Sequence, residues 1–353
     1  MKSSYEIAVL PGDGIGVDVT EEAVRVLQAV VAVIPELELC FSEVSVGAAE
    51  YLRNGDPLPE IAFEACRQAD AVLLGAMGLP SVRWPDGKEM TPQIDLRERL
   101  DLYAGLRPIY LYAANDSPLK GHQVGAIDFL LVRENTEGLF AARLNATRPT
   151  PDEARDTMSI TRKGSERVCR AAFEHAMNRR HKVTLVDKAN VLPSMVFFRE
   201  IFNEVAKEFP EVETEAVYVD AAALFLVQRP HTFDVIVTEN MFGDILSDLA
   251  AGLVGGMGMA PSGDIGDDYA VFQPSHGTAP DIAGKGIANP VATILSAGMM
   301  LDWLNSETAN KGGRMITEAV RKVLEDPGNR TPDMGGKLST TDMGDRIIAA
   351  LKS

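Results

Sequence analysis

Several kinds of residue are scarce in this 353-residue chain, and each scarcity excludes a class of protein. There are only three cysteines, Cys40, Cys66 and Cys169, and no CxxC motif, so neither a disulfide framework nor a zinc site is expected. Few, unpaired thiols are typical of a cytoplasmic protein, which is the location we expect. No apolar run approaches the roughly 20 residues that cross a bilayer, so no membrane association is expected.

Basic residues are also in deficit. The chain carries 34 Lys and Arg against 51 Asp and Glu, a formal net charge of -17. Nucleic-acid binding requires a basic face, so no nucleic-acid partner is expected, and an anionic membrane surface fits equally poorly. A small acidic substrate remains compatible with this charge if a few arginines converge on it.

Short apolar segments alternate with amphipathic helical segments, and this alternation indicates an α/β architecture. The length of the chain favours two lobes over one core. Strands are expected at residues 7–10, 71–74, 107–112, 126–132, 182–186, 215–219 and 233–238, and helices at residues 17–33, 95–102 and 165–179. Two segments interrupt the pattern. Residues 141–158 are polar and predict a protruding arm or a disordered loop, and the Gly- and Met-rich residues 252–266 predict an irregular stretch that continues to His276.

Three aspartates form a candidate metal site. Asp244 and Asp248 lie four residues apart in a helix expected to open at Gly243, so they share one helical face. Like charges there disfavour the helix unless a cation lies between them, although a solvated acidic face near a helix N-terminus is the alternative. Asp220 is expected to end a strand. Three carboxylates with no Cys or His beside them suit Mg²⁺ or Mn²⁺.

Three arginines are candidates for binding substrate carboxylates, because guanidinium and carboxylate groups match in geometry. Arg97 lies on a predicted helix, Arg107 begins one predicted strand and Arg133 ends another. If these two strands are antiparallel neighbours, Arg107 and Arg133 lie at the same end of the sheet. Each arginine alone also fits a surface ion pair, so the prediction is their convergence.

Lys188 follows the predicted strand at residues 182–186, and catalytic groups of α/β folds usually lie at such strand ends. Near a metal its pKa could fall far enough for it to act as a base. The alternative is a salt bridge with Asp187.

Two glycine-rich turns are candidate ligand loops. Residues 11–16 have the spacing G-x-G-x-G rather than the G-x-G-x-x-G of the dinucleotide fingerprint, so they predict a tight turn, not a Rossmann site. Residues 276–284 form a second turn. There Asp281 suits the ribose hydroxyls of NAD and would repel the 2′-phosphate of NADP.

Taken together, seven motifs that cover nearly the whole chain in order resemble the β-decarboxylating dehydrogenases, the family of 3-isopropylmalate, isocitrate, homoisocitrate and tartrate/D-malate dehydrogenases. They are LPGDGIG (10–16), LR with LRP (96–108), VRENTEG (132–138), DKANV (187–191), YVDA (218–221), NMFGDILSD (240–248) and HGTAPDIAG (276–284).

The resemblance implies an isopropylmalate/isocitrate dehydrogenase-like two-lobed fold that lacks the usual Rossmann domain. Residues 1–102 and 255–353 would form the first lobe and residues 103–254 the second. Residues 141–158 would be an arm that joins two subunits of a homodimer with shared active sites.

The resemblance also implies a role for each candidate residue. Arg97, Arg107 and Arg133, with Asn190, would bind a small polycarboxylate substrate. Asp244 and Asp248, with Asp220 of the other subunit, would hold Mg²⁺ or Mn²⁺, and Lys188 of the other subunit would help to remove the hydroxyl proton. The adenosine side of NAD would lie against His276, Gly277, Thr278, Ala279, Pro280, Asp281, Ile282 and Asn289.

Two positions depart from the family pattern. Phe140 stands where the family usually has the tyrosine that protonates the enolate carbon, and phenylalanine has no proton to give. Gln93, with Thr91 two residues before it, stands where isopropylmalate enzymes have an apolar pocket, and an amide facing an isopropyl group would go unsatisfied.

We therefore expect NAD-dependent oxidation, with decarboxylation, of a 2-hydroxy di- or tricarboxylic acid with a polar substituent, similar to tartrate, D-malate or isocitrate. A 3-isopropylmalate dehydrogenase of leucine biosynthesis is one alternative. A non-catalytic regulatory subunit is the other, although retention of Lys188, the aspartates and the arginines speaks against it.

Overall fold

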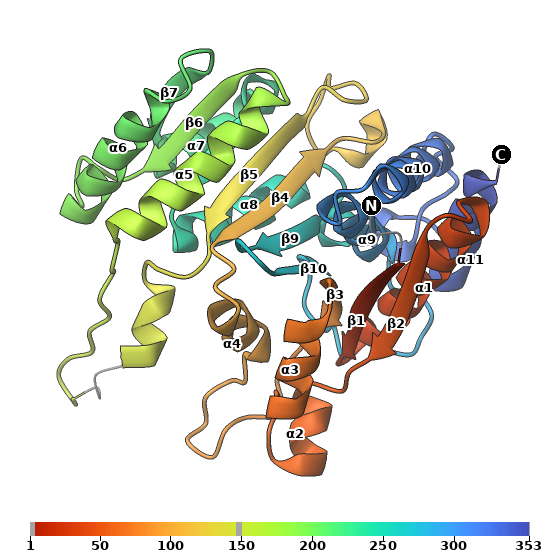
Figure 1. Ribbon diagram of the computed structural model, residues 1–353. Helices are drawn as coiled ribbons and strands as arrows, with labels where there is room; N and C mark the ends of the chain where they lie inside the picture. The colour runs from red at the N-terminus through yellow and green to blue at the C-terminus, as the bar shows by residue number, and fades with distance from the viewer. Residues whose placement is uncertain (1–3, 146–149, 353) are drawn as a thin grey trace.

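A sheet of ten strands runs through the described part of the chain, residues 4–145 and 150–352, in this computed structural model (Figure 1). In spatial order its strands are β2 (Glu38–Glu43), β1 (Ser4–Gly12), β3 (Ala71–Ala76), β10 (Ala270–Pro274), β9 (Pro261–Ile265), β4 (Ala104–Tyr110), β5 (Asp128–Glu134), β8 (Val235–Thr238), β6 (Lys182–Asp187) and β7 (Glu213–Tyr218). The central strands β10, β9, β4 and β5 pair antiparallel, and the strands outside them pair parallel. The predicted α/β architecture is therefore confirmed.

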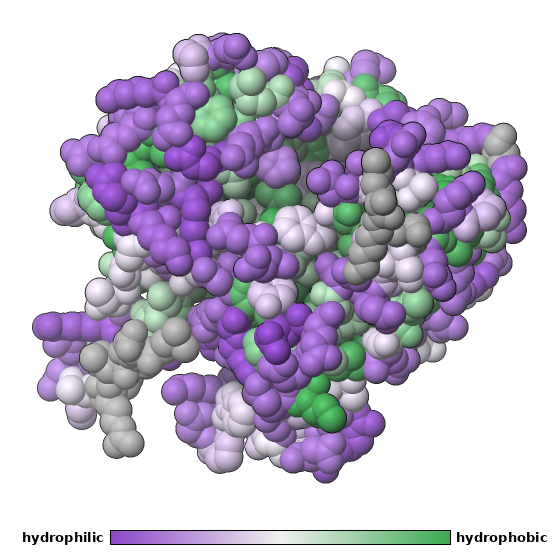
Figure 2. All heavy atoms as spheres, in the orientation of Figure 1, coloured by the Kyte–Doolittle hydropathy of each residue, from purple (hydrophilic) through white to green (hydrophobic). Residues whose placement is uncertain are grey.

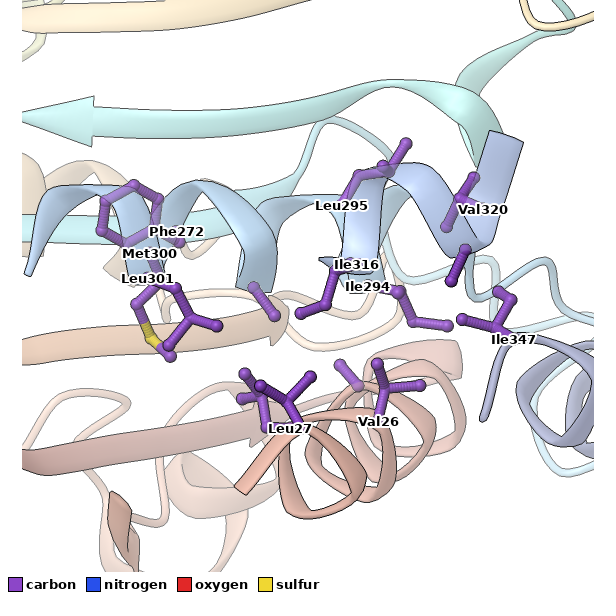
Figure 3. Packing of buried hydrophobic residues seen from close by; sticks show 14 of the residues in the cluster. Val26, Leu27, Phe272, Ile294, Leu295, Met300, Leu301, Ile316, Val320 and Ile347 are labelled. Carbon is purple, nitrogen blue, oxygen red and sulfur yellow. The ribbon is translucent and has the colours of Figure 1, made fainter. Parts of the chain in front are cut away.

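Helices cover both faces of the sheet because its buried strands present apolar side chains alternately to each side. In β1, for example, Ile7 and Val9 join one core cluster while Ala8 and Leu10 join another. The first cluster lies under α1 (Ile15–Val33), α9 (Val291–Trp303), α10 (Glu307–Leu324) and α11 (Thr340–Leu351). Figure 3 shows Val26 and Leu27 of α1 facing side chains of α9 and Phe272 of β10.

The opposite face of this half of the sheet is covered by short helices. They are α2 (Ala48–Asn54), α3 (Glu60–Gln68) and α4 (Pro92–Arg99). The other half of the sheet is covered on one side by α5 (Arg162–Met177) and α6 (Pro193–Ala206) and on the other by α7 (Val219–Gln228) and α8 (Asn240–Gly252). The surface seen in Figure 2 is mostly hydrophilic, with only scattered hydrophobic patches.

Several predicted boundaries were wrong. Arg107 does not begin a strand, because β4 starts three residues earlier, and Asp220 lies in the first turn of α7 rather than at a strand end. The helix that carries Asp244 begins at Asn240, not at Gly243. The stretch from residue 252 to His276 is not irregular throughout, since it contains β9 and β10.

The predicted arm at residues 141–158 lies partly outside the described residues, because 146–149 are not among them. Its first residues belong to a short 3-10 helix, Phe140–Asn145. The segment returns to the rest of the molecule at a bridge between Gly138 and Ser159. No helix in the described part of the chain is long and apolar enough to cross a membrane.

Candidate active site

Two of the three predicted arginines are aligned on one face of the sheet by strand register. Gly105 of β4 pairs with Arg133 of β5 on one side and with Asp264 of β9 on the other. Side chains two residues apart in a strand share a face, so Arg107 points to the same side as Arg133 and Asp264. Gly105 lacks a side chain, and a Cβ there would lie 2.7 Å from the amide of Asn135. The glycine therefore leaves space for the polar groups around it.

Arg97 reaches the same place from α4. Its Nε and Nη2 donate to Oδ2 of Asp264 at 3.2 and 3.0 Å, and both Nη atoms of Arg107 donate to Oδ1 of Asp264 at 3.1 Å. The predicted convergence of Arg97 and Arg107 is thus present in the structure, with a buried carboxylate between them that the sequence did not reveal.

Arg133 lies beside these two cations but is held by α8. Its Nε and Nη2 donate to Oδ1 of Asn240 at 3.0 and 2.7 Å, and its Nη1 forms an ion pair with Asp244. Burial, together with repulsion from Arg97, lowers the pKa of Arg133 to about 10. The group remains a cation at neutral pH. Its guanidinium carbon lies 5.0 Å from the ring centroid of Phe140.

Asp244 and Asp248 lie one turn apart on α8. Partial burial and the charge of Asp244 raise the pKa of the Asp248 carboxyl above its ordinary value. Two neighbouring carboxylates form a place where a hard cation is favourable, so these residues fit one side of a Mg²⁺ or Mn²⁺ site. In the described part of one chain, no group of three or more His, Cys, Asp or Glu residues is arranged to hold a metal ion.

Asp220, the third predicted metal ligand, pairs with Lys188 instead. Oδ1 of Asp220 accepts from Nζ of Lys188, and this hydrogen bond lowers the pKa of the carboxyl. The alternative pairing of Lys188 with Asp187 is not observed, because Asp187 accepts from Nε and Nη2 of Arg199, each at 2.7 Å. Asn190 is exposed nearby on the loop after β6. The described part of one chain therefore does not group Asp220 and Lys188 with Asp244 and Asp248 at the cavity.

A cavity of about 210 Å³ opens at the arginines. Most of the predicted substrate and metal residues line it, with two residues of the predicted cofactor loop: Gln93, Arg97, Arg107, Arg133, Phe140, Asp244, Asp248, His276 and Gly277. Three serines that the sequence did not suggest also line it: Ser247, Ser262 and Ser275. Thr91 is not among its lining residues and precedes α4 at the N-cap position.

Three polar atoms of residues that line this cavity are buried without a hydrogen-bond partner in the described part of the chain. They are Oε1 of Gln93, Oγ of Ser275 and Nε2 of His276. Burial lowers the pKa of the His276 imidazole, so the ring is neutral at physiological pH. Unpaired buried polar atoms are uncommon in folded proteins, and three around one cavity indicate that a polar ligand completes them.

The predicted cofactor loop follows β10. Oγ1 of Thr278 donates to the carbonyl of Gly78 at 2.7 Å, and the Thr278 carbonyl accepts from the amide of Ile15 at 2.8 Å. The first glycine-rich turn is thus packed against the second. Its Asp13 accepts from the backbone amides of Ala48 and Ala49 at the start of α2, which is a structural role.

The other predicted cofactor residues lie around the same turn. Ile282 packs against the cluster of Ile15 and Val19, as does Ala279 three residues earlier, which has a positive φ of 35°. Pro280 and Asp281 are exposed at the tip of the loop. Asn289 is buried at the start of α9, where its amide donates to Oδ2 of Asp333 at 3.1 Å.

Comparison with known proteins identifies one family, and the relatives within it carry two different enzyme names. Residues 6–347 match the family described as isocitrate/isopropylmalate dehydrogenase. The chain is 47% identical over 361 residues to the 3-isopropylmalate dehydrogenase of Moorella thermoacetica, with 99% of both chains covered. It is 46% identical over 352 residues to the isocitrate/homoisocitrate dehydrogenase of Thermus thermophilus, again with 99% of both covered. A solved isocitrate dehydrogenase from Methylococcus capsulatus, 38% identical, superposes with a TM-score of 0.89 over 99% of this chain and 100% of that one.

Proposed function

This chain belongs to the isocitrate/isopropylmalate dehydrogenase family, and from that premise we propose that it oxidises, with decarboxylation, a small 2-hydroxy di- or tricarboxylic acid that carries a polar substituent. The chain is an oxidoreductase of the β-decarboxylating type. NAD as hydride acceptor, Mg²⁺ or Mn²⁺ as metal and the polar substituent are the parts that we propose.

Gln93 carries the choice of substrate. Its side chain lines the cavity one helical turn from Arg97, and its Oε1 is buried without a partner. An apolar substituent would leave this oxygen unsatisfied, at a cost of about 1–3 kcal/mol, whereas a hydroxyl would donate to it. A tartrate- or malate-like acid, with a hydroxyl or a water molecule at this position, therefore fits better than 3-isopropylmalate.

The arginines and aspartates divide the remaining binding. Arg97, Arg107 and Arg133 line the cavity with donors that suit substrate carboxylates. Asp244 and Asp248, with Asp220 of a second copy, would hold the divalent metal. When bound, this metal supplies a Lewis acid that polarises the substrate hydroxyl and stabilises negative charge after CO2 departs.

A homodimer would bring the separated halves of the site together. Besides Asp220, α7 exposes Leu224 and Val227, and α8 exposes Ile245, although these three are large apolar side chains. The two helices contact each other, so their exposed apolar residues lie on adjoining elements. Such a surface is typical of a subunit interface.

Lys188 of the second copy would serve as the base. Its amine would accept the substrate hydroxyl proton in an oxidation for which NAD, when bound, would supply the hydride acceptor, so that a 2-keto acid would form. Loss of CO2 from the neighbouring carbon leaves a carbanion equivalent that must gain a proton. Phe140 lines the cavity and cannot supply that proton, so water or another side chain has to do so.

The loop after β10 supports NAD as the acceptor. Nε2 of His276 is a buried nitrogen without a partner at the junction of the cavity and this loop. Asp281 is exposed on the loop, where its carboxylate can accept from both ribose hydroxyls of NAD and would repel the 2′-phosphate of NADP.

A substrate panel tests the proposal. NADH and CO2 are measured in parallel with Mn²⁺ and D-malate, tartrate, isocitrate, homoisocitrate or 3-isopropylmalate. We expect turnover of at least one acid with a hydrogen, hydroxyl or carboxylate substituent. Turnover of none would favour a regulatory subunit, and a strong preference for 3-isopropylmalate would refute the interpretation of Gln93.

The metal site has its own test. Asp244→Asn removes one carboxylate charge from α8, so Mn²⁺ affinity and NADH formation should both fall. We expect a loss of at least about a hundredfold, because loss of a mere hydrogen-bond partner of a metal ligand already costs about 10–100-fold. Asp248→Asn should behave alike, and Asp326→Asn, after α10, is a control at an exposed aspartate outside the cavity. Unchanged Mn²⁺ binding by the two α8 variants would exclude this site.

A further inference from the structure

Asp264 of β9 is a buried carboxylate at the centre of the arginine cluster, and neither the sequence motifs nor the proposed reaction explains it. Its side chain is only 2% exposed. Besides Arg97 and Arg107, it accepts from Nδ2 of Asn135 at 2.9 Å and from Nε2 of Gln273 at 2.8 Å. Burial alone would favour the neutral acid, but the charges of Arg97 and Arg107 hold the pKa of Asp264 well below its usual range. The residue is therefore an anion at any physiological pH.

The register of the sheet fixes where this anion lies. Asp264 pairs with Gly105 on one side and with Val271 on the other, so Gln273, two residues beyond Val271, shares its face. That face is the one on which Arg107 and Arg133 lie. Since β9 has neighbours on both sides, the sheet fixes the backbone of Asp264, and its four hydrogen-bond partners hold the carboxylate in place.

The two arginines give Asp264 much of their hydrogen-bonding capacity. Arg97 uses Nε and Nη2, and Arg107 uses both Nη atoms, one of which also donates to the Leu106 carbonyl at 3.0 Å. In this network of described residues, Nη1 of Arg97 and Nε of Arg107 are the guanidinium nitrogens that remain. A guanidinium without such a partner offers a carboxylate two parallel donors.

The positive and negative side chains around the cavity are equal in number. The three arginines are matched by the carboxylates of Asp244, Asp248 and Asp264, and the Asp220 and Lys188 of a second copy neutralise each other. A divalent metal would add two positive charges, which would be balanced by the two negative charges of a dicarboxylate. A third substrate carboxylate would approach arginines that Asp264 already neutralises, and like charges at such distances repel strongly in a site of low dielectric.

We propose that Asp264 is a positioning residue that restricts the substrate to dicarboxylates by occupying and neutralising Arg97 and Arg107. This proposal rests on the proposed function, and it narrows the substrate from di- or tricarboxylic acids to dicarboxylic ones. Gln93 then selects the substituent, so the two residues together favour a 2-hydroxy dicarboxylate with hydrogen or a hydroxyl as its third group.

The first test compares two substrates in one preparation, because a ratio of kcat/KM values does not depend on the fraction of folded enzyme. The wild type should prefer D-malate or tartrate over isocitrate. Asp264→Asn should raise the isocitrate-to-malate ratio by about tenfold or more, mainly through KM, since one charge less at Arg97 and Arg107 favours the acid with one charge more.

Asp234→Asn is the matched control. Asp234 is equally buried and ion-paired, with Nε of Arg179 at 2.9 Å, but it precedes β8 at the far end from the cavity. It should lose stability without a change in the substrate ratio. An unchanged ratio in Asp264→Asn, or a wild type that prefers isocitrate, would overturn the proposal.

A second test needs no variant and therefore stands even if Asp264→Asn fails to fold. Propane-1,2,3-tricarboxylate and glutarate differ by one carboxylate on the middle carbon, and neither can be oxidised at a hydroxyl. Calorimetry with wild-type protein and Mg²⁺ should show glutarate binding at least as tightly as the tricarboxylate. Clearly tighter tricarboxylate binding would refute the role of Asp264. Absence of turnover with every acid, by contrast, would refute the proposed function and leave this binding comparison to decide the inference.

Discussion

Gln93 is the residue whose replacement should change the substrate most directly. Gln93→Leu replaces the unpaired Oε1 with an apolar branch of similar size. We expect kcat/KM for D-malate or tartrate to fall about tenfold and that for 3-isopropylmalate to rise, because a mismatched buried polar group costs about 1–3 kcal/mol. Gln93→Glu is the control that keeps the position polar. If Gln93→Leu leaves the ranking of substrates unchanged, this residue does not face the substituent.

Phe140 bears on the last step of the reaction. Phe140→Tyr places a phenol in the cavity on a ring whose centroid lies 5.0 Å from the guanidinium carbon of Arg133, and that cation favours proton release. The ratio of CO2 to NADH should rise in this variant, as measured in a coupled assay. Phe140→Leu is the matched control and should leave the ratio as it is. A wild type that already releases one CO2 per NADH would show that another group protonates the product.

Some of the site residues could be predicted from the sequence and others could not. Strand order predicted that Arg107 and Arg133 lie at the same end of the sheet, and Arg97 was predicted to converge with them; all three line one cavity. Asp264 was missed because it lies in a glycine-containing segment without a strand-like pattern, and nothing in a sequence distinguishes a buried aspartate from an exposed one. Its only signal was the surplus of buried cations that required a counter-charge.

At the scale of the elements, α7 and α8 should decide whether the site assembles. Leu224→Glu introduces a charge into the exposed apolar surface of α7, where Leu224 is 51% exposed. We expect this variant to sediment as a monomer and to lose activity, because Lys188 and Asp220 would no longer reach Asp244 of the other copy. Sedimentation and NADH formation are measured on the same sample.

The control for that variant is Ile61→Glu on α3. Ile61 is 83% exposed but lies on a helix remote from α7 and α8 in the sheet order. It should change neither the oligomeric state nor activity. A Leu224→Glu protein that is monomeric and fully active would show that one chain suffices.

The elements themselves were predictable where their periodicity was strong. Long amphipathic helices and buried apolar strands were found with boundaries a few residues off, as β4 and α8 illustrate. The pair β9 and β10 was missed, since both strands have only five residues, β9 contains proline and glycine, and their conformation is stabilised by pairing with β3 and β4 on either side. Register of that kind depends on contacts between segments far apart in the chain.

At the scale of the whole molecule, the arginine network should also contribute to stability. Asp264→Asn leaves two buried guanidiniums without their anion, which is expected to cost about 3–5 kcal/mol in the free energy of unfolding at pH 7. The pKa of Asp264 in the folded protein lies below its usual range, so this contribution is complete above the unfolded pKa of about 4 and is lost as the pH falls through the folded pKa.

Urea unfolding of wild type and Asp264→Asn should therefore differ most at neutral pH, and the difference should shrink below pH of about 4. Carboxylates remote from the arginine cluster titrate alike in the two proteins, so the difference reports on Asp264 and the groups coupled to its arginines. A difference that stays constant from neutral to strongly acidic pH would mean that Asp264 stabilises the fold through shape and not through charge.

The two-lobed division at residues 102 and 254 stays a proposal at this scale. The buried side chains form separate clusters on the two halves of the sheet, which agrees with it, but the sheet itself continues from one half to the other through β9 and β4. The cavity lies at these central strands, so both halves contribute to one site.

The most direct test of the proposed substrate specificity is the ratio of two kcat/KM values, measured with wild-type enzyme, NAD and Mn²⁺. The ratio compares tartrate or D-malate with 3-isopropylmalate. A clear preference for the polar acid is expected, because Gln93 and Asp264 together select a dicarboxylate with a small polar third group. A clear preference for 3-isopropylmalate, or equal use of isocitrate in the same assay, would contradict it.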